Sequence, residues 1–412
     1  MTTQATDLAA RPVRAEGQVT DVTQSPGPFV VVHSLTTVVG VNLNRDMNDL
    51  PKSLWHGGTE RMRVSSQSLV RAAREYMRTD GSHDRISALS TKSLPHAVAQ
   101  HLETEHDVDP ADAGPAAALI VAATGLSVSP ADPGRTNVMA YMPEDSAQQL
   151  SRLVLSHWDG LAVQRERVED LIAEALQPAE RGTSSRRKPR APISAADLPE
   201  SVVTAAQAVL EPGTVEEIAL FGRMLAGLPS GRVISAAHVA HGFGVEPLQL
   251  ITDEFTAGDD YQDGGIFANT GMLGRQYLVS GTFYRQAALD RHQLRKTLAL
   301  SGRPQDEVEA LAQSAERRWT RAIVRSLPSG KRSRTGSPPR PTLAVVTTAD
   351  EALTASPAFE DAICEQPAGP HAATRLATYL HELGLRGGTA LWHSPTGDAA
   401  PGLPDVLAVT GY

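Results

Sequence analysis

Apolar residues recur along this chain with the spacing of strands in some stretches and of helices in others. Residues 28–36, PFVVVHSLT, form a β-branched run that is typical of a buried strand. Two later runs, QYLVSGTFYRQAAL at 276–289 and PTLAVVTTA at 341–349, predict two more strands. A weaker final strand is expected around DVLAVT, near the end of the chain.

Helical spacing dominates residues 79–180, where four Ala-rich windows predict a helical insertion. These windows are LPHAVAQHLETEH, AAALIVAAT, SAQQLSRLVLSHW and VQRERVEDLIAEALQ. A further helix is predicted over residues 305–328. We expect its buried face to hold Val308, Leu311, Ala312, Ala315, Trp319, Ala322 and Ile323.

Two segments between these elements have weaker patterns. EEIALFGRML at 216–225 resembles a strand, and VISAAHVAHGFGV at 233–245 is interpreted as a short helix ended by glycines. Residues 246–278 are acidic and spaced by glycine, which predicts a long excursion between two core elements. The resulting order of strand, helix, insertion, strands, helix and strand is typical of an α+β fold.

Composition places the chain among ordinary globular proteins. Hydrophobic residues make up 41% and charged residues 21%, and no apolar run approaches the roughly 18 residues of a membrane span. The first 27 residues lack an apolar signal core and are expected to be a disordered tail. One cysteine, Cys364, excludes an internal disulfide. These features predict a cytoplasmic protein with no membrane partner.

Charge is distributed unevenly along the chain. The formal net charge of −9 argues against a generic binder of polyanions. However, residues 317–340 hold eight lysines or arginines and no acid, and residues 181–190 hold five and no acid. A chain with such segregated charge can bind phosphate locally. Its aromatic content of 4% argues against extensive stacking on nucleobases.

The stretch RMRVSSQSLVRAAREYM, residues 61–77, concentrates basic side chains where a strand runs into a helix. Arg61 and Arg63 share one face of the strand, and Ser65 or Ser66 is a natural N-cap. The predicted buried stripe is Leu69, Ala72, Ala73 and Tyr76, and the basic stripe beside it is Arg71, Arg74 and Arg78. This arrangement favours a phosphate contact, and a solvated basic face is the alternative.

Four motifs in order carry a resemblance to a known family. HSLTTVVGVNLNRD, GGTERMRVSSQSLVRAAR, ALFGRMLAG and LVSGTFYRQAALD resemble the CasC family, the backbone subunit of Cascade, the type I-E CRISPR surveillance complex. The similarity covers residues 30–78 and 216–300 and weakens towards about residue 345. It implies an RRM-like (ferredoxin-like) palm with a helical fingers insertion and a long thumb loop.

This resemblance divides the chain into six segments. They are a disordered tail at 1–27, the first part of the palm at 28–78, the helical fingers insertion at 79–205, the continued palm at 206–245, the thumb loop at 246–278, and the completed palm with a C-terminal elaboration at 279–412. The Pro/Ser/Arg segment at 178–192 is expected to be a loop inside the insertion.

The resemblance also implies a function in antiviral defence. Copies of such a subunit stack head to tail along the spacer of a CRISPR RNA and present it for pairing with target DNA, without cleaving it. A guide must keep its base edges free, so the protein should hold the sugar–phosphate backbone. The implied partners are CRISPR RNA, target DNA through the guide, copies of the chain itself and other Cascade subunits. No cofactor and no metal are expected.

The implied RNA-binding residues are Asn44, Arg45, Lys52, Arg63, Ser65, Gln67, Arg71, Arg74, Met224, Phe255 and Lys331. Each has a structural alternative. Asn44 and Arg45 could form an Asx-turn with a surface salt bridge to Asp46, and Ser65 and Gln67 could only cap the helix. Val70 departs from the family, whose members have a basic residue there.

Three of these residues have alternatives of other kinds. Met224 could be an ordinary core methionine, Phe255 could simply hold the thumb together, and Lys331 could belong to a solvated charge run. We expect the acids of the thumb to reach basic segments such as 331–334 of a neighbouring copy. These acids are Asp253, Glu254, Asp259, Asp260 and Asp263.

Two other functions fit parts of the sequence less well. Asp46 lies near the acid of RNA-cleaving relatives, but one aspartate without a partner is a weak metal-dependent endoribonuclease site. His238 and His241 have helical spacing and no third ligand nearby, so a structural role is favoured over zinc. A protein-only scaffold would fit the negative net charge, and co-purification of RNA would separate it from the RNA-binding function.

Overall fold

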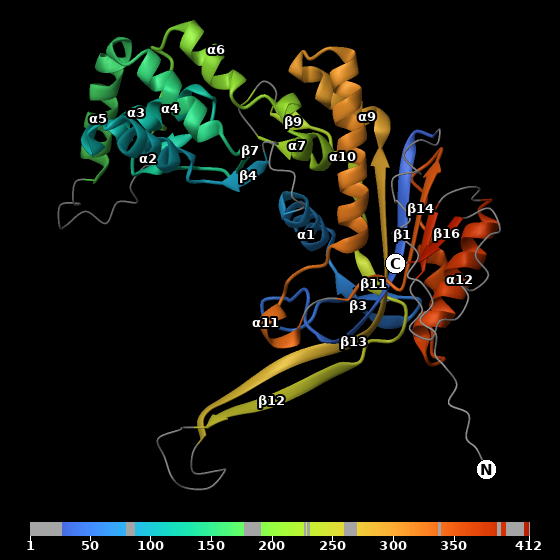
Figure 1. Cartoon of the computed structure of the whole chain (residues 1–412). Coiled ribbons are helices and arrows are strands. Elements are labelled where there is room, and N and C mark those ends of the chain that lie inside the picture. Colours follow the sequence, from blue (N-terminus) through green and yellow to red (C-terminus); the bar gives the residue numbers. More distant parts are fainter. Residues whose placement is uncertain are drawn as a thin grey trace, which may run out of the picture. The chain divides into compact units, whose positions relative to one another are not determined.

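The computed structural model describes residues 27–79, 87–176, 191–225, 228, 231–258, 270–336, 339–384, 389–392 and 408–411 (Figure 1). It confirms the predicted α+β class. The chain forms two compact units. Unit 1 comprises Met1–Asp80, His238–Arg291 and Glu316–Tyr412, and unit 2 comprises Gly81–Ala237 and His292–Ala315.

A large, mainly antiparallel sheet organises unit 1. Its strand order is β16-β15-β14-β1-β13-β11-β3-β2, and β10 and β12 also pair with β13. The strands are β1 (Phe29–Val41), β2 (Ser53–His56), β3 (Thr59–Val64), β10 (Ala237–Val239), β11 (Gly242–Gly244), β12 (Leu250–Gly258), β13 (Thr270–Asp290), β14 (Leu343–Ala349), β15 (Thr389–Trp392) and β16 (Ala408–Gly411). The three strands predicted from β-branched runs are therefore β1, β13 and β14.

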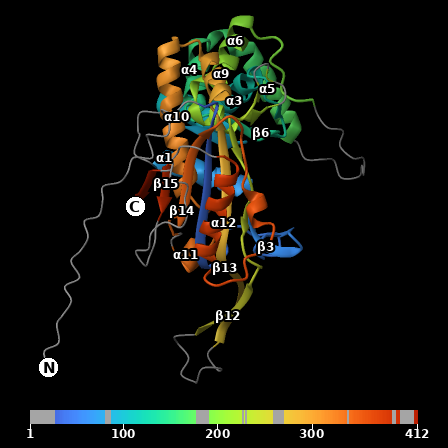
Figure 2. The same cartoon turned by 90° about the vertical axis from the view of Figure 1, so that its right-hand side faces the viewer.

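The central strand β1 is buried on both faces, which explains its nearly continuous apolar sequence. It pairs with β13 from Phe29 opposite Asp290 to Val38 opposite Gly281, and a bulge follows before Val41. One face carries Leu35 and Tyr284 in a cluster with α12 (Ala368–Glu382), which contacts β1 and β13 (Figure 2). The other face carries a cluster with α1 (Ser66–Thr79).

A paired ribbon replaces much of the long loop that the sequence predicts at 246–278. β12 pairs with the first half of β13 from Leu250 opposite Val279 to Gly258 opposite Thr270, and the two strands extend away from the rest of unit 1 (Figure 1). The acids of β12, Asp253 and Glu254, stand next to each other, so its sequence has no strict period of two, and pairing with β13 forms the strand. Residues 259–269 lie outside the described part of the chain.

Two further predictions of secondary structure are wrong. Residues 216–221 form the helix α7 (Glu216–Phe221) and not a strand, in keeping with the helix propensity of Glu, Ala and Leu. Residues 237–244 form strands β10 and β11 and not a helix. Pairing with β13 overrides the local pattern there, and Gly244 permits close approach because a Cβ atom would lie 3.2 Å from the Met62 amide nitrogen.

Unit 2 contains the helical insertion, and the four predicted windows are helical. Its helices and strands are α2 (Leu94–His106), α3 (Pro110–Ala123), α4 (Ser146–Ser156), α5 (Ala162–Leu176), α6 (Glu200–Ala208), β4 (Ala88–Thr91), β5 (Val128–Ser129), β6 (Asp132–Thr136), β7 (Ala140–Pro143), β8 (Arg223–Met224) and β9 (Arg232–Val233). Helix α3 is apolar around its circumference and forms the centre of this core.

Helix α10 (Gln305–Arg325) buries the predicted stripe, except that Leu311 is only half-buried. In α1, Met77 is buried in place of Tyr76, which is half-buried. The remaining helices are α9 (Arg291–Leu298), α11 (Arg332–Thr335), α12 and the 3₁₀ turns Asp159–Leu161, Pro212–Thr214, Ala299–Ser301 and Ser356–Phe359. In the described residues, no helix is both long and apolar enough to cross a bilayer.

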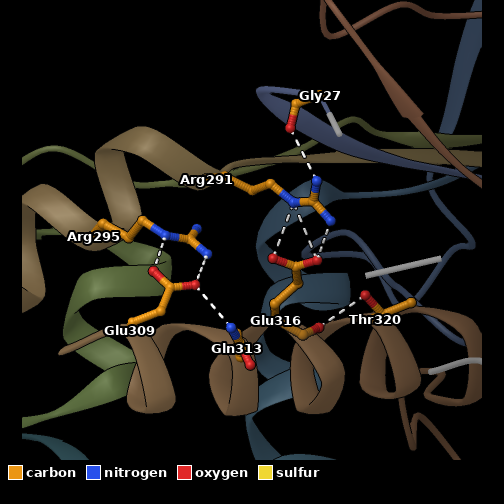
Figure 3. Close-up of polar contacts among 7 residues, drawn as sticks. All are labelled: Gly27, Arg291, Arg295, Glu309, Gln313, Glu316 and Thr320. Carbon is orange, nitrogen blue, oxygen red and sulfur yellow. Dashed lines mark hydrogen bonds and ion pairs between the residues drawn. The ribbon is translucent and has the colours of Figure 1, made fainter. Parts of the chain in front are cut away.

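A buried ion pair ties α10 to the start of α9 in unit 1 (Figure 3). Arg291 Nη2 lies 2.6 Å from Glu316 Oε1, and Arg291 Nε lies 3.0 Å from Oε2. Arg291 Nη1 also donates to the carbonyl oxygen of Gly27, before β1. The Glu316 side chain is 1% exposed and that of Arg291 10%, so two opposite charges share one dry site.

Candidate nucleic-acid interface

The loop between β1 and β2 is fixed by its own polar groups. Asp46 Oδ1 accepts hydrogen bonds from the amides of Asn48 and Leu50, so Asp46 forms the Asx-turn of this loop, whereas Asn44 Oδ1 accepts from the Ser65 amide. Arg45 Nη1 pairs with Asp49 Oδ1 at 2.6 Å, so the alternative of an Asx-turn at Asn44 with a salt bridge from Arg45 to Asp46 is wrong. The carboxylate of Asp46 is already used by the turn that places Asp49 opposite Arg45.

Lys331 comes to the same loop from a distant part of the chain. Its ammonium lies 2.5 Å from Asp49 Oδ2, and its side chain is only 11% exposed. A Cβ atom at Gly330 would lie 2.6 Å from the Leu43 carbonyl oxygen, so glycine is needed for this approach. The hydrogen bond from Lys331, with one from Arg45, lowers the pKa of Asp49. Lys331 is therefore not a member of a solvated charge run.

These two segments enclose a polar hollow. It is lined by Leu43, Asn44, Arg45, Asp46, Met47, Asp49 and Gly330. Two carboxylates, Asp46 and Asp49, stand against the two cations Arg45 and Lys331, so the hollow carries no excess of positive charge. Charge alone therefore does not favour an anion in it.

The start of α1 is capped by three different segments. The Ser65 hydroxyl accepts from the amide of Ser68 at 3.3 Å, which confirms the predicted N-cap. Asn44 Oδ1 accepts from the Ser65 amide and His241 Nδ1 from the Ser66 amide, both at 2.9 Å. Gln67 has an exposed side chain. Within the described residues, its backbone N–H donates to no acceptor.

Lys52, Arg63 and His241 bring basic groups together from three neighbouring segments. The Lys52 carbonyl accepts from the Arg63 amide at 2.8 Å, and Arg63 stands opposite Phe243 in the pairing of β3 with β11. Burial, then the charges of Arg63 and Lys52, lower the pKa of His241. In the described part of the chain, neither Lys52 nor Arg63 forms an ion pair, and the buried Nε of Arg63 has no acceptor.

Arg61 shares the face of Arg63 but has a structural role. Its side chain is fully buried, and its guanidinium donates to the carbonyl oxygens of Gly244, Val245 and Glu360. These bonds anchor the β2–β3 hairpin to the body of unit 1. Arg63, two residues later, is thereby held at a defined position on the sheet.

The predicted basic stripe of α1 is partly engaged with one acid of the same helix, Glu75. Arg71 Nε lies 2.7 Å from Glu75 Oε1, but the Arg71 side chain is 81% exposed. Such an exposed ion pair contributes little to the free energy of folding, so Arg71 can leave Glu75 and bind a stronger anion instead. Arg74 is half-buried on the adjoining side of the helix, and so is Val70.

Met224 and Phe255 have different surroundings. Met224, on β8 of unit 2, is 86% exposed, which rules out the core methionine that was the alternative. Phe255, on β12 of unit 1, is half-buried against Gly274 across the ribbon, where a Cβ atom would lie 2.3 Å from its ring. The guanidinium of Arg334 lies 5.5 Å from the centre of this ring. Phe255 therefore does hold the ribbon together.

The ribbon satisfies its described acids within the chain. Glu254 accepts from Arg275 at 2.7 Å, and Asp253 accepts from Gln276 at 2.6 Å. The other acids predicted to reach a neighbouring copy, Asp259, Asp260 and Asp263, lie outside the described residues. Met272 and Leu273 are 55% and 72% exposed, so the ribbon presents apolar groups to its surroundings.

Metal chemistry is the alternative that the sequence connects with Asp46, His238 and His241. Across the parts of the chain that the structure describes, no group of three or more His, Cys, Asp or Glu side chains is placed to hold a metal ion. His238 and His241 lie on extended chain and not on a helix, so their predicted helical spacing is wrong. The sequence pattern did not connect His241 with Lys52 and Arg63, because only the sheet brings these segments together.

Comparisons with known proteins give a family and a fold. The model of the CT1975-like protein family matches residues 30–386. A solved chain titled "CRISPR RNA-guided surveillance complex, pre-nicking" is 26% identical, with a TM-score of 0.72 over 93% of this chain and 96% of its own. A second, titled "CRISPR RNA-guided surveillance complex", shares the fold at 23% identity and a TM-score of 0.64, over 93% and 95%. No curated protein matches the sequence. Because the family model spans most of its length, the chain belongs to the CT1975-like protein family.

Proposed function

We propose that this chain is the non-catalytic, RNA-binding backbone subunit of a type I-E CRISPR surveillance complex, of the CasC type. The observation that carries this proposal is the 26% identity to a chain of a solved CRISPR RNA-guided surveillance complex, over 93% of this chain and 96% of that one. A match over nearly the whole of both chains supports equivalent roles more strongly than a shared domain would.

In this proposal the parts of the chain have separate tasks. The sheet of unit 1 with α1 is the RRM-like palm, the helical insertion at 79–205 forms the fingers, and the ribbon of β12 and β13 is the thumb. Copies stack head to tail along the spacer, because an interface between two different surfaces extends into a filament when it does not close. The exposed Met272 and Leu273 on the ribbon support such a contact, since exposed apolar groups favour burial against a partner.

The palm would hold the guide through its phosphates. Lys52 and Arg63 supply positive charge that no described acid neutralises. The free backbone N–H of Gln67 adds a hydrogen-bond donor at the start of α1. Arg71 and Arg74 would extend this contact along the helix, as the weak pair with Glu75 permits. None of these groups reads base edges, so the guide stays available for pairing with target DNA.

The hollow beside the palm would position this contact. Asp49 fixes Arg45 and Lys331, and Asn44 links the loop to the N-cap of α1. Loop, helix start and the segment 329–331 are thus held in one arrangement before RNA binds. Such pre-organisation lowers the entropic cost of binding.

Charge reversal tests the proposal. In Arg71→Glu with Arg74→Glu, attraction to phosphates becomes repulsion, so co-purified RNA should be lost while circular dichroism stays that of the wild type. Arg135→Glu with Arg152→Glu, on exposed positions of unit 2, changes the net charge equally and is the matched control. A wild-type RNA yield from the Arg71/Arg74 variant would contradict the assignment of α1 to the RNA.

A further inference from the structure

His241 has one nitrogen committed to the protein and one available to a ligand. Its Nδ1 lies 2.9 Å from the amide nitrogen of Ser66, the first residue of α1. A backbone N–H only donates, so Nδ1 must be the acceptor, and the proton of the neutral ring is on Nε2. The residue is exposed, so this Nε2–H donor is open to groups outside the chain.

The surroundings of His241 are basic. Phe243 pairs with Arg63 across the sheet, and Gly242 pairs with Val64. His241 directly precedes Gly242, so it lies beside the residues that follow Arg63 in the chain. Lys52 precedes β2, the strand next to β3, and its carbonyl binds the Arg63 amide. In the part of the chain that the structure describes, neither of these two cations is in an ion pair, and the buried Nε of Arg63 lacks an acceptor.

We propose that His241, Arg63 and Lys52 together bind one phosphate group, to which His241 donates from Nε2 while its Nδ1 caps α1. The inference rests on the proposed function for the nature of its ligand, a phosphate of the nucleic-acid backbone. Three donors from three chain segments surround the anion, which suits the several oxygens of a phosphate. Burial and the two cations lower the pKa of His241, which keeps the ring neutral and the Ser66 contact intact.

The competing explanation is that His241 only caps α1. Ser66→Pro separates the two roles, because proline is well tolerated at the first position of a helix and removes the amide that His241 accepts from. In the Ser66→Pro background His241 has no amide to cap, so a purely capping His241 would no longer affect binding. A His241 that binds phosphate through Nε2 would still contribute. His238→Phe is the matched control, since His238 is also exposed, three residues earlier, beside Phe29.

The binding experiment uses a fluorescently labelled single-stranded RNA of random sequence, and measures anisotropy at low salt. Loss of a hydrogen bond to a charged group corresponds to about a tenfold or greater loss of affinity. We expect His241→Phe to weaken binding by about tenfold, and Ser66→Pro with His241→Phe to weaken it as much relative to Ser66→Pro alone. His238→Phe should bind as the wild type does. If His241→Phe has no effect, or loses its effect once Ser66 is proline, the phosphate role is overturned.

A second measurement is independent of RNA. The ring-nitrogen resonances of His241 are followed by NMR as inorganic pyrophosphate is added to the wild-type chain. The inference predicts that the Nε2 resonance of His241 shifts and that of His238 does not. A His241 resonance that stays in place overturns the inference. A shift in a chain that binds no RNA would leave the phosphate site standing and refute the proposed function instead.

Discussion

Removing Arg291 should destabilise the protein far more than removing Arg295, although each arginine makes a bidentate pair with a glutamate of α10 (Figure 3). Glu316 is 1% exposed, so Arg291→Ala leaves a carboxylate in a site from which water is excluded. Breaking a buried ion pair in this way costs about 3–5 kcal/mol. The lost bond to the Gly27 carbonyl adds to this cost.

Arg295 provides the matched control in unit 2. Its side chain is 28% exposed and that of Glu309 39%, so water can solvate Glu309 once Arg295 is gone. Partly exposed pairs of this kind contribute about 0.2–1 kcal/mol. Gln313, which donates to Glu309 Oε1 at 2.9 Å, remains as a partner. The free energies of unfolding of Arg291→Ala and Arg295→Ala should therefore differ by at least about 2 kcal/mol, with Arg291→Ala the less stable.

Urea unfolding followed by tryptophan fluorescence measures the difference, because the buried Trp319 lies on α10 three residues after Glu316. Arg291→Met with Glu316→Leu should regain most of the lost stability, since apolar residues of similar volume carry no desolvation cost. A loss below about 1 kcal/mol in Arg291→Ala would refute the reasoning. So would a double variant that is as unstable as the single one.

Three other predictions concern pH, backbone and salt. Burial lowers the pKa of His33 from 6.5 to about 4. The unfolded chain therefore takes up this proton at a higher pH than the folded one, so the stability of the protein is full above pH 6.5 and is lost progressively as pH falls from 6.5 through 4. His33→Gln, compared with the wild type by urea unfolding at pH 7 and pH 4, should remove about 3 kcal/mol of this pH dependence. Gly57→Ala should lower the free energy of unfolding by about 2–5 kcal/mol, measured by thermal denaturation, because φ is +57° and the new Cβ would lie 1.7 Å from the Glu360 carbonyl oxygen. Gly58→Ala is the control: φ is +71° but the new Cβ would meet open space, so the loss should be about 1–2 kcal/mol. RNA affinity should fall steeply with salt and be equal for a spacer and its scrambled version, and a strong preference for one of them would contradict backbone binding.

The sequence predicts the elements whose patterns are locally unambiguous. The β-branched composition of β1 and the helical spacing of the apolar stripe of α10 are strong local signals, and both elements are present as predicted. The segment 237–244 fits a helix as well as a strand, and its pairing beside β13 decides between them. The sequence of β12 does not predict the ribbon for a related reason, because it has no strict period of two and the strand forms by pairing with β13.

The candidate site shows the same limit at the level of single residues. The N-cap role of Ser65 follows from local sequence and is present. That Arg45 pairs with Asp49 and not with Asp46 depends on the turn that Asp46 itself caps. The approach of Lys331 to Asp49 joins residues 282 positions apart, and no periodicity predicts such a contact.

The most direct test of the account measures how many copies of the chain bind one RNA. The purified chain is mixed with single-stranded RNAs of increasing length and random sequence. The molar mass of the complexes is measured by light scattering after gel filtration, and their shape is examined by negative-stain electron microscopy. A backbone subunit that holds phosphates predicts regular filaments whose number of copies rises in equal steps with RNA length, whatever the sequence. A chain that binds no RNA, or that binds as a single copy at every length, would contradict the account.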